Sequence, residues 1–421
     1  MKALLKSLKV VDKQSPWHLQ TVDILIKDGV IQKIAKNIKA DGVKVYDFKS
    51  YSVSPGFVDM NSFLSEPGFE HRDDITSTLN SALAGGFTDV LLFPTSNPTI
   101  QTKSDVEYIL NKSDKHIVNA YCVGALTVNR EGKEMTEMYD MKRSGAIAFS
   151  DADKSVQDAG VMSRAILYAK GIDSFVIHFS EDKNVAGKTT VNEGVMSTLL
   201  GMKGNPSLAE ELMVSRDLFL AEYQDAKVHL SNISSARSVE LIKAAKKRGV
   251  KVTADVSINH LCYDETVLEG FDSNFKLHPP LRTATDIKAL RQGLKDGTID
   301  AISSAHKAVE KEHKDVEFEV AYDGVINLQT LLTQALNISS KSLEWSDMVE
   351  ALTNKPRSIL GLEQKSINID QMASLCIYDE NEEWIFNEKS NKSKSQNSNL
   401  FGQTLKGKVK VVINNNQLTT I

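Results

Sequence analysis

The sequence predicts an α/β protein whose main part is a closed (β/α)8, or TIM, barrel with a smaller β-module at its side. Three observations support this prediction. The middle of the chain alternates apolar segments with helical patterns, both ends are rich in strand patterns, and 421 residues exceed a barrel of about 250 residues by one small module.

The N-terminal part, residues 1–55, reads as short strands. The stretch VDILIKDGVIQKIA contains two apolar runs joined at Asp28-Gly29, which is a strong hairpin signal. The C-terminal end has the same style in SLCIYDENEEWIF and GKVKVVINNN, and the polar stretch 387–399 between them predicts a loop. We expect both ends to form one discontinuous β-module, residues 1–55 plus 367–421, around a barrel of residues 56–366.

The middle of the chain supplies the barrel strands. GFTDVLLFP (86–94) predicts a buried strand, and similar segments follow in HIVNAYCVGAL, AIAFSD, SFVIHFSED, AKVHLSNIS, VKVTADVS and IDAISSAH. Helical patterns separate them, such as 235–249 with Gly249 as its C-terminal cap. Alternating strands and helices indicate a parallel sheet, and about eight such units favour a closed barrel. In that fold, chemistry occurs at the carboxyl ends of the strands.

Composition excludes some partners and locations from the expected function. Charges are mixed, with 50 basic and 55 acidic residues and a net charge of −5, so nucleic acid is not an expected partner. Three widely spaced cysteines, Cys122, Cys262 and Cys376, indicate a reducing compartment. The first residues lack the pattern of a signal peptide, and no apolar stretch approaches the roughly 20 residues of a membrane span. We therefore expect a cytoplasmic protein without membrane contact.

Several motifs carry a family resemblance, in this order: PGFVDMNSFLSEPGFEHRDD, GGFTDVLLFPTSNP, GAIAFSDAD, HFSED, LAEELMVSRD, KLHPPLR, DGTID and NLFGQTLKGKVK. Together they resemble dihydroorotase of the amidohydrolase superfamily over nearly the whole chain. The resemblance implies a barrel of the amidohydrolase type with a flanking β-sandwich made from both chain ends. It also implies reversible cyclisation of N-carbamoyl-aspartate to dihydroorotate, in pyrimidine biosynthesis, with zinc as the cofactor.

The chemistry implied by the resemblance needs a metal that lowers the pKa of a bound water. It also needs a carboxylate that carries the proton and a cation that holds the substrate carboxylate. By resemblance, the six metal-ligand positions of the family are Asn61, Phe63, Asp151, His178, Asn232 and Ala305. Only Asp151 and His178 can ligate a metal well, and Ala305 also stands where the family has its proton-carrying aspartate.

The substrate-binding positions differ as well. By resemblance they are Ser65 in place of an arginine, Thr95 in place of an asparagine, His278 in place of an asparagine and Val309 in place of a histidine. Ser65 cannot supply the charged, two-pronged donor of an arginine. We therefore expect no tightly bound cofactor. We also expect Phe63 to fill the vacated space, and Lys307, Lys311 and Lys314 to lie on a solvated charged surface.

These departures leave three hypotheses. The first is a non-catalytic homologue, a pseudoenzyme, that acts as a structural or regulatory partner of aspartate transcarbamoylase and forms a homodimer. The second is a hydrolase of another cyclic amide, with one weakly bound zinc at Asp151 and His178. The third is a binding module for a pyrimidine intermediate. We favour the first, because metal, proton carrier and substrate contact are all changed while the framework motifs remain.

Overall fold

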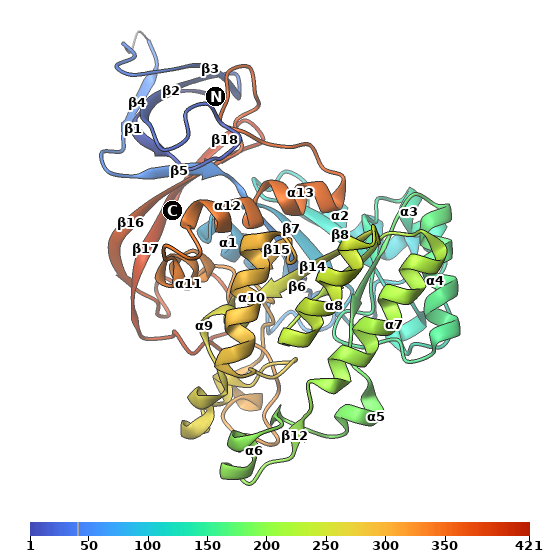
Figure 1. The fold of residues 1–421 in the computed structure, drawn as a ribbon. Helices are drawn as coiled ribbons and strands as arrows, with labels where there is room; N and C mark the ends of the chain where they lie inside the picture. The colour runs from blue at the N-terminus through green and yellow to red at the C-terminus, as the bar shows by residue number, and fades with distance from the viewer. Residues whose placement is uncertain (40–41) are drawn as a thin grey trace.

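The computed structural model describes residues 1–39 and 42–421, and it contains a barrel with a β-layer at one side (Figure 1). Within the described residues no helix combines the length and the apolar character that a membrane crossing requires. This architecture, a barrel sheet beside a separate sheet that contains both chain ends, confirms the sequence-based prediction of the fold class.

The β-layer contains strands from both ends of the chain. The sheet runs in the order β18-β17-β16-β5-β1-β2-β3, with β4 beside β1. The bounds are β1 Lys2–Val10, β2 Thr21–Lys27, β3 Val30–Ala35, β4 Lys44–Asp47, β5 Ser52–Pro55, β16 Leu375–Ile385, β17 Thr404–Asn414 and β18 Gln417–Thr420. Strand β5 joins the two ends, since it pairs parallel with β1 and antiparallel with β16. We propose the limits 1–55 plus 367–421 for this part and 56–366 for the barrel.

The predicted hairpin at Asp28-Gly29 is confirmed. Strands β2 and β3 pair antiparallel with Lys27 opposite Val30, so the loop contains two residues. Asp28 and Gly29 both have positive φ, 52° and 81°. This is the backbone that a two-residue hairpin turn requires, and glycine adopts it without steric cost.

Eight parallel strands of the described chain form the barrel, in the order β15-β14-β13-β10-β9-β8-β7-β6. A parallel bridge between Ser62 and His306 closes the ring, and the Phe63 N–H donates to the His306 carbonyl at 2.9 Å. The bounds are β6 Phe57–Phe63, β7 Phe87–Phe93, β8 Asn119–Gly124, β9 Ala148–Phe149, β10 Val176–Phe179, β13 Val228–Ser231, β14 Val252–Ser257 and β15 Ala301–Ser303.

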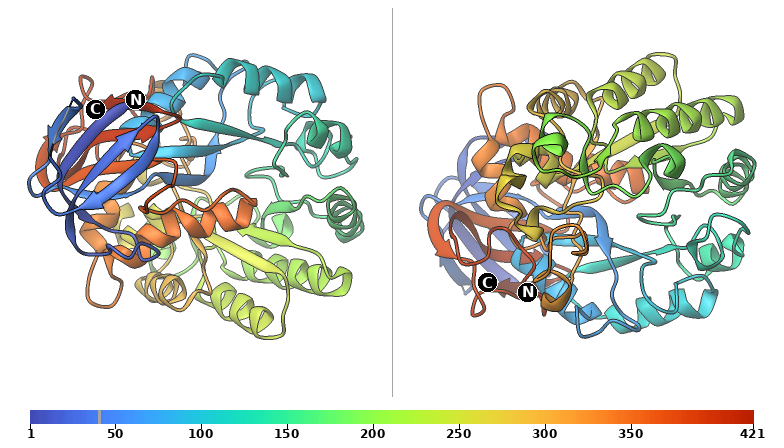
Figure 2. Two further views of the ribbon diagram at one scale, coloured as in Figure 1. Left: turned by 90° about the horizontal axis from the view of Figure 1, so that it is seen from above. Right: turned by 90° about the horizontal axis from the view of Figure 1, so that it is seen from below.

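Helices surround these strands, as both views along the barrel show (Figure 2). The longer ones are α1 Ile75–Ala84, α2 Lys103–Ser113, α3 Met138–Arg143, α4 Ala159–Gly171, α7 Leu208–Gln224, α8 Ala236–Lys247, α10 Ala284–Asp296, α11 Leu331–Ile338, α12 Trp345–Leu352 and α13 Asn354–Leu360. The predicted helix 235–249 is confirmed as α8, and Gly249 takes the left-handed conformation (φ 87°) just after it. The short elements α5 Lys183–Ala186, β11 Val191–Asn192, α6 Val195–Leu199, β12 Gly204–Asn205 and α9 Ile258–Cys262 lie in loops after strands.

A buried ion pair fastens the amino end of the barrel. Arg357 of α13 is almost completely buried, and its guanidinium contacts the Asp89 carboxylate of β7. The same guanidinium donates to the Gly56 carbonyl at 3.0 Å. Each charge therefore compensates the other inside the protein, and removal of either one would leave a buried charge without a partner.

Candidate functional site

The positions singled out in the sequence lie at the carboxyl ends of the barrel strands, as expected. Asn61 and Phe63 belong to β6, His178 to β10, and Asp151, Asn232 and Ala305 follow β9, β13 and β15. A small cavity opens there. Four of the predicted site residues line it: Phe63, Asn232, His278 and Ala305.

Asp151 points away from this cavity. Its Oδ1 accepts from the backbone N–H of Leu126 at 3.0 Å and of Thr127 at 2.9 Å, and its Oδ2 accepts from the Thr127 hydroxyl. The carboxylate thus fastens the loop after β8. Burial raises the pKa of Asp151 above its usual value, although these donors oppose the shift.

His178 is also fully engaged. Its Nδ1 lies 2.6 Å from the Asp217 Oδ2 of α7, and its Nε2 accepts from the Val156 N–H at 3.0 Å. An imidazole that donates through one nitrogen and accepts through the other has no free lone pair. Asp151 and His178, the two side chains at the metal-ligand positions that could ligate a metal well, are therefore both used in structural contacts.

A network of hydrogen bonds spans the barrel at the strand ends that, by resemblance, carry the family's metal-ligand positions. The Asn61 amide donates to the Ser231 hydroxyl at 3.1 Å, and that hydroxyl donates to Asp255 at 2.9 Å. Asp255 also accepts from the Ser303 hydroxyl at 2.7 Å and lies 2.9 Å from His229 Nε2. The carboxylate at the centre is thus satisfied by hydrogen bonds from the two neighbouring strands, β13 and β15.

The residues present do not fit zinc. The Oδ1 atoms of Asn61 and Asn232 are buried and make no hydrogen bond within the described chain. These are neutral amide oxygens, whereas zinc takes imidazole, thiolate and carboxylate. Across residues 1–39 and 42–421, no three histidine, cysteine or acidic side chains lie close enough together to hold a metal ion.

Phe63 and Lys307 occupy the mouth of the barrel. The Phe63 ring stacks on Phe93, with centroids 6.4 Å apart, and the Lys307 Nζ lies 5.0 Å above the Phe63 ring. The same ammonium forms ion pairs with Asp153 at 3.0 Å and Asp323 at 2.6 Å. Burial alone would lower the pKa of Lys307, but the two carboxylates outweigh it and raise the pKa above its usual value. The expectation of a solvated lysine is wrong here.

The remaining cavity is very small. Its volume is about 20 Å³, between Phe63, Asn232, His278, Ala305 and Lys307. A volume of about 10–15 Å³ holds one water, whereas ligand sites of small molecules measure about 300–1,000 Å³. In this conformation the strand ends have room for a water and not for a substrate.

Of the predicted substrate positions, His278 lines this cavity. The Thr95 hydroxyl donates to the Leu64 carbonyl at 2.8 Å, and the Ser65 carbonyl accepts from the Phe69 N–H. Val309 is buried, and its N–H donates to the Asn397 side chain at 3.1 Å. His278 is partly exposed, with its ring 4.8 Å from Phe179.

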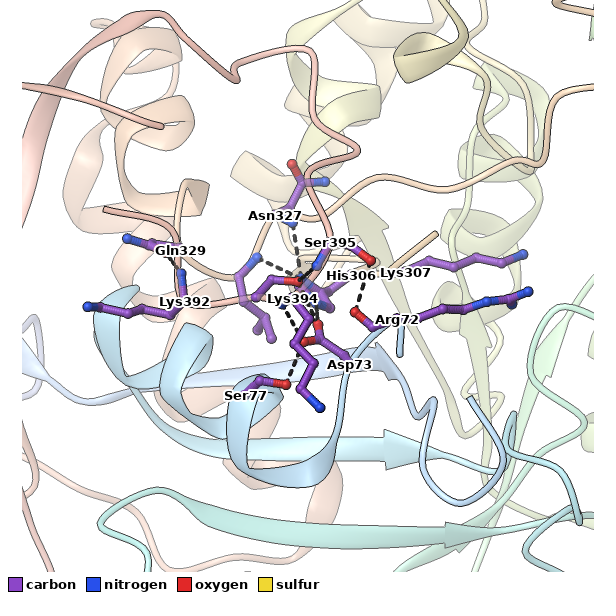
Figure 3. A network of polar contacts seen from close by, with 12 residues as sticks. Arg72, Asp73, Ser77, His306, Lys307, Asn327, Gln329, Lys392, Lys394 and Ser395 are labelled. Carbon is purple, nitrogen blue, oxygen red and sulfur yellow. Dashed lines mark hydrogen bonds and ion pairs between the residues drawn. The ribbon is translucent and has the colours of Figure 1, made fainter. Parts of the chain in front are cut away.

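The segment 390–399 covers the side of the barrel mouth (Figure 3). Asp73, which follows β6, accepts from the Lys394 N–H at 2.9 Å and from the Ser393 hydroxyl at 2.7 Å, and it lies 3.3 Å from His306 Nε2. Residues 387–399 form a loop, as predicted, but Ser395 and the residues Asn397 and Ser398 are buried. The polar side chains of this segment form hydrogen bonds with the barrel part of the chain, for example from Ser395 to the Arg72 carbonyl and from Asn397 to the Lys307 carbonyl.

Lys314 also departs from expectation, whereas Lys311 is exposed as predicted. The Lys314 side chain is buried, and its Nζ donates to the Ser273 carbonyl at 2.7 Å. Burial lowers the pKa of Lys314 to about 7.

Two buried carboxylates escaped the sequence-based selection. Asp255 is described above, and Asp59 of β6 accepts from the Ser304 N–H at 2.7 Å and from its hydroxyl at 2.8 Å. Burial raises the pKa of Asp59 to about 6. The signal was present, because an aspartate inside the apolar runs GFVDM and VTADV must have a partner in the core.

Comparison with known proteins agrees with this geometry at the level of the fold. A family described as dihydro-orotase-like matches residues 52–238. A dihydroorotase of Ruminiclostridium cellulolyticum is 38% identical over 416 residues, covering 98% of this chain and 97% of the relative. A dihydroorotase of Acetivibrio thermocellus is 38% identical over 409 residues, covering 96% of each.

Solved structures show the same architecture at low sequence identity. The L-hydantoinase (dihydropyrimidinase) from Arthrobacter aurescens superimposes with a TM-score of 0.85 at 19% identity, over 99% of this chain and 96% of that one. A D-hydantoinase superimposes with a TM-score of 0.84 at 20% identity, over 100% and 95%. At this identity the likeness concerns the fold alone.

Proposed function

Because this chain belongs to the dihydroorotase family, we propose that it serves pyrimidine biosynthesis in the cytoplasm as a non-catalytic member of that family. One observation carries the proposal. The strand ends enclose only about 20 Å³, with the Lys307 ammonium held over the Phe63 ring by two aspartates. A substrate would have to displace both.

The chemistry of the site supports the same proposal. Ring opening of a cyclic amide needs an activated water, a group that carries its proton, and a cation for the substrate carboxylate. Ala305 has no proton to transfer, and Ser65 is uncharged. The donors present do not suit zinc.

We propose a structural or regulatory role for the barrel, with aspartate transcarbamoylase as the partner. The proposal is supported by a retained fold in which the residues at the metal-ligand, proton-carrier and substrate positions are changed. The test is to mix the two purified proteins and to measure the sedimentation of the mixture and the transcarbamoylase rate. A complex, or a changed rate, is expected. Separate sedimentation with an unchanged rate would remove this partner.

The decisive experiment measures zinc content and dihydroorotase turnover on one preparation. The Acetivibrio thermocellus relative, purified with added zinc in the same way, is the positive control. We expect turnover at least about 10⁴-fold below the control, as loss of the proton carrier and ligands implies, and zinc far below one per chain. Stoichiometric zinc with turnover near that of the control would refute the proposal.

A second candidate is an active hydrolase of a cyclic amide, which is favoured by the 38% identity to proteins named dihydroorotase. It requires Lys307 and the segment 390–399 to move away from the strand ends. The same preparation discriminates the two, because only this candidate predicts metal-dependent turnover. Thermal shift with dihydroorotate, carbamoyl-aspartate, orotate and uridine nucleotides tests the remaining hypothesis of a binding module, which predicts a higher melting temperature.

A further inference from the structure

Helix α7 exposes an apolar stripe on its outer face. Leu208, Leu212, Phe219 and Tyr223 are 50%, 46%, 66% and 87% exposed, while the inner face of the same helix is buried against the barrel. A surface helix of a soluble protein normally directs polar side chains outward. Since α7 is apolar on its outer face as well as on its buried inner face, the outer face is indicated as a contact surface.

The neighbouring barrel helices α8 and α10 follow the usual pattern. The exposed positions of α8 are mainly charged, for example Arg237, Glu240 and Lys243, and α10 exposes Lys288 and Lys295. The stripe continues onto α4 through Leu167, which is 58% exposed. The two helices are adjacent, because Gln224 of α7 donates to the Ser163 carbonyl of α4 at 2.8 Å. Figure 1 shows α4 and α7 side by side at the edge of the barrel, opposite the β-layer.

The spacing within the stripe is symmetric. Leu208 and Leu212 are four residues apart, as are Phe219 and Tyr223, and the two pairs are equally far from a point between Ser215 and Arg216. An antiparallel second copy of α7 would place Leu208 opposite Tyr223 and Leu212 opposite Phe219. Such self-complementarity is the property of a two-fold interface, and a different partner would not require it.

The centre of the stripe permits close approach. Ser215 is small, and the neighbouring Arg216 is turned inward, since its Nη1 donates to the Val156 carbonyl at 2.7 Å and its Nη2 pairs with Asp217 at 2.7 Å. Helices with small residues at the crossing point approach to about 8 Å. The proposed axis is therefore flanked by a small serine and by an arginine whose charge is engaged within its own chain.

The exposed area is sufficient for a dimer. With about 200 Å² for a fully exposed large side chain, the five side chains leave about 600 Å² per copy open to solvent. Two copies would bury about 1,200 Å² from these residues alone, which is the lower end for specific interfaces before their surroundings are counted.

We propose that the outer face of α7, with Leu167 of α4, is the contact surface between two copies of this chain, paired antiparallel about an axis near Ser215. The proposal is independent of whether the barrel is catalytic. It specifies a homodimer in which the two barrels meet through their helices, away from the β-layers.

The test compares variants in sedimentation velocity at micromolar concentration. The wild type is expected at twice the chain mass of 46.5 kDa, and the double variant Leu212→Lys/Phe219→Lys at the mass of one chain. Loss of central interface side chains should raise the dissociation constant by roughly 30-fold or more. Val320→Lys is the matched control, because Val320 is 63% exposed but lies on a loop outside the stripe. Circular dichroism verifies folding of each variant.

A cross-link tests the geometry. Ser215→Cys should form a disulfide-linked dimer under mild oxidation, whereas Ser342→Cys, at an exposed position outside the stripe, should not. A monomeric wild type, a dimer that survives the double variant, or equal cross-linking at both positions would each overturn the proposal.

Discussion

Replacement of Asp59 with asparagine is expected to stabilise the protein at neutral pH and to destabilise it slightly in acid. Asp59 lies fully buried in β6, and burial raises its pKa from 3.8 to about 6. Between these two pH values the folded state binds more protons than the unfolded state. Stability contributed by the protonated carboxyl is therefore lost as the pH rises from about 4 through 6, and above pH 6 the ionised group carries its full cost.

The magnitude follows from the two pKa values. The difference between 3.8 and about 6 corresponds to about 3 kcal/mol at about 1.4 kcal/mol per pH unit. Asparagine keeps an oxygen for the Ser304 N–H but loses the acceptor of the Ser304 hydroxyl, which costs about 1 kcal/mol. The net expectation is a gain of about 2 kcal/mol at pH 7.5, and a loss of about 1 kcal/mol below pH 4.

Urea unfolding of the wild type and of Asp59→Asn at pH 7.5, 6 and 4 measures this change. Asp255→Asn is the matched control, because Asp255 is an equally buried barrel carboxylate that accepts from Ser231 and Ser303, so its replacement should destabilise the protein at pH 7.5, where Asp59→Asn stabilises it. A pH-independent effect of Asp59→Asn would refute the reasoning, since it would mean that burial does not favour the protonated form of this carboxyl.

Three further perturbations test other parts of the structure. Lys307→Met removes the cation of Asp323, whereas Asp153 keeps its ion pair with Arg130 at 3.0 Å, and should lower the unfolding free energy by about 1 kcal/mol, which thermal unfolding checks against Lys311→Met. Asp73→Ala frees the segment 390–399, so trypsin should cleave after Lys394 several-fold faster than in the wild type. Arg357→Leu strands a buried Asp89 and should cost about 3–5 kcal/mol, whereas the double variant Arg357→Leu/Asp89→Leu should recover most of the loss; an equal loss in both would contradict an ionic cause.

The barrel and the hairpin were predictable because both depend on local patterns. Strand β7 is a mainly apolar run that is buried throughout, and the turn at Asp28-Gly29 needs only two residues with positive φ. The positions compared with the family's ligands were also accessible from the sequence, because each lies in or shortly after the carboxyl end of a strand within a recognisable motif. The chemistry of Asn61 and Phe63 could thus be judged before any coordinates.

Other parts of the site depend on contacts between distant residues. Lys307 is exposed or buried according to Asp153 and Asp323, and no local pattern places these three together. Likewise, the polar segment 390–399 resembles any surface loop until its partner Asp73, more than 300 residues earlier, is known. Tertiary hydrogen bonds, rather than composition, decide whether such residues face water.

The pairing of β5 with β16 has a consequence for biosynthesis. Pro55 lies opposite Leu375, about 320 residues later, so the N-terminal strands leave the ribosome long before their neighbour exists. At about 5–20 residues per second the delay is roughly 15–60 s, during which the edge of β5 is unpaired. Such an edge can bind other nascent chains. High-yield expression should therefore benefit from chaperones that shield this strand until the C-terminus emerges.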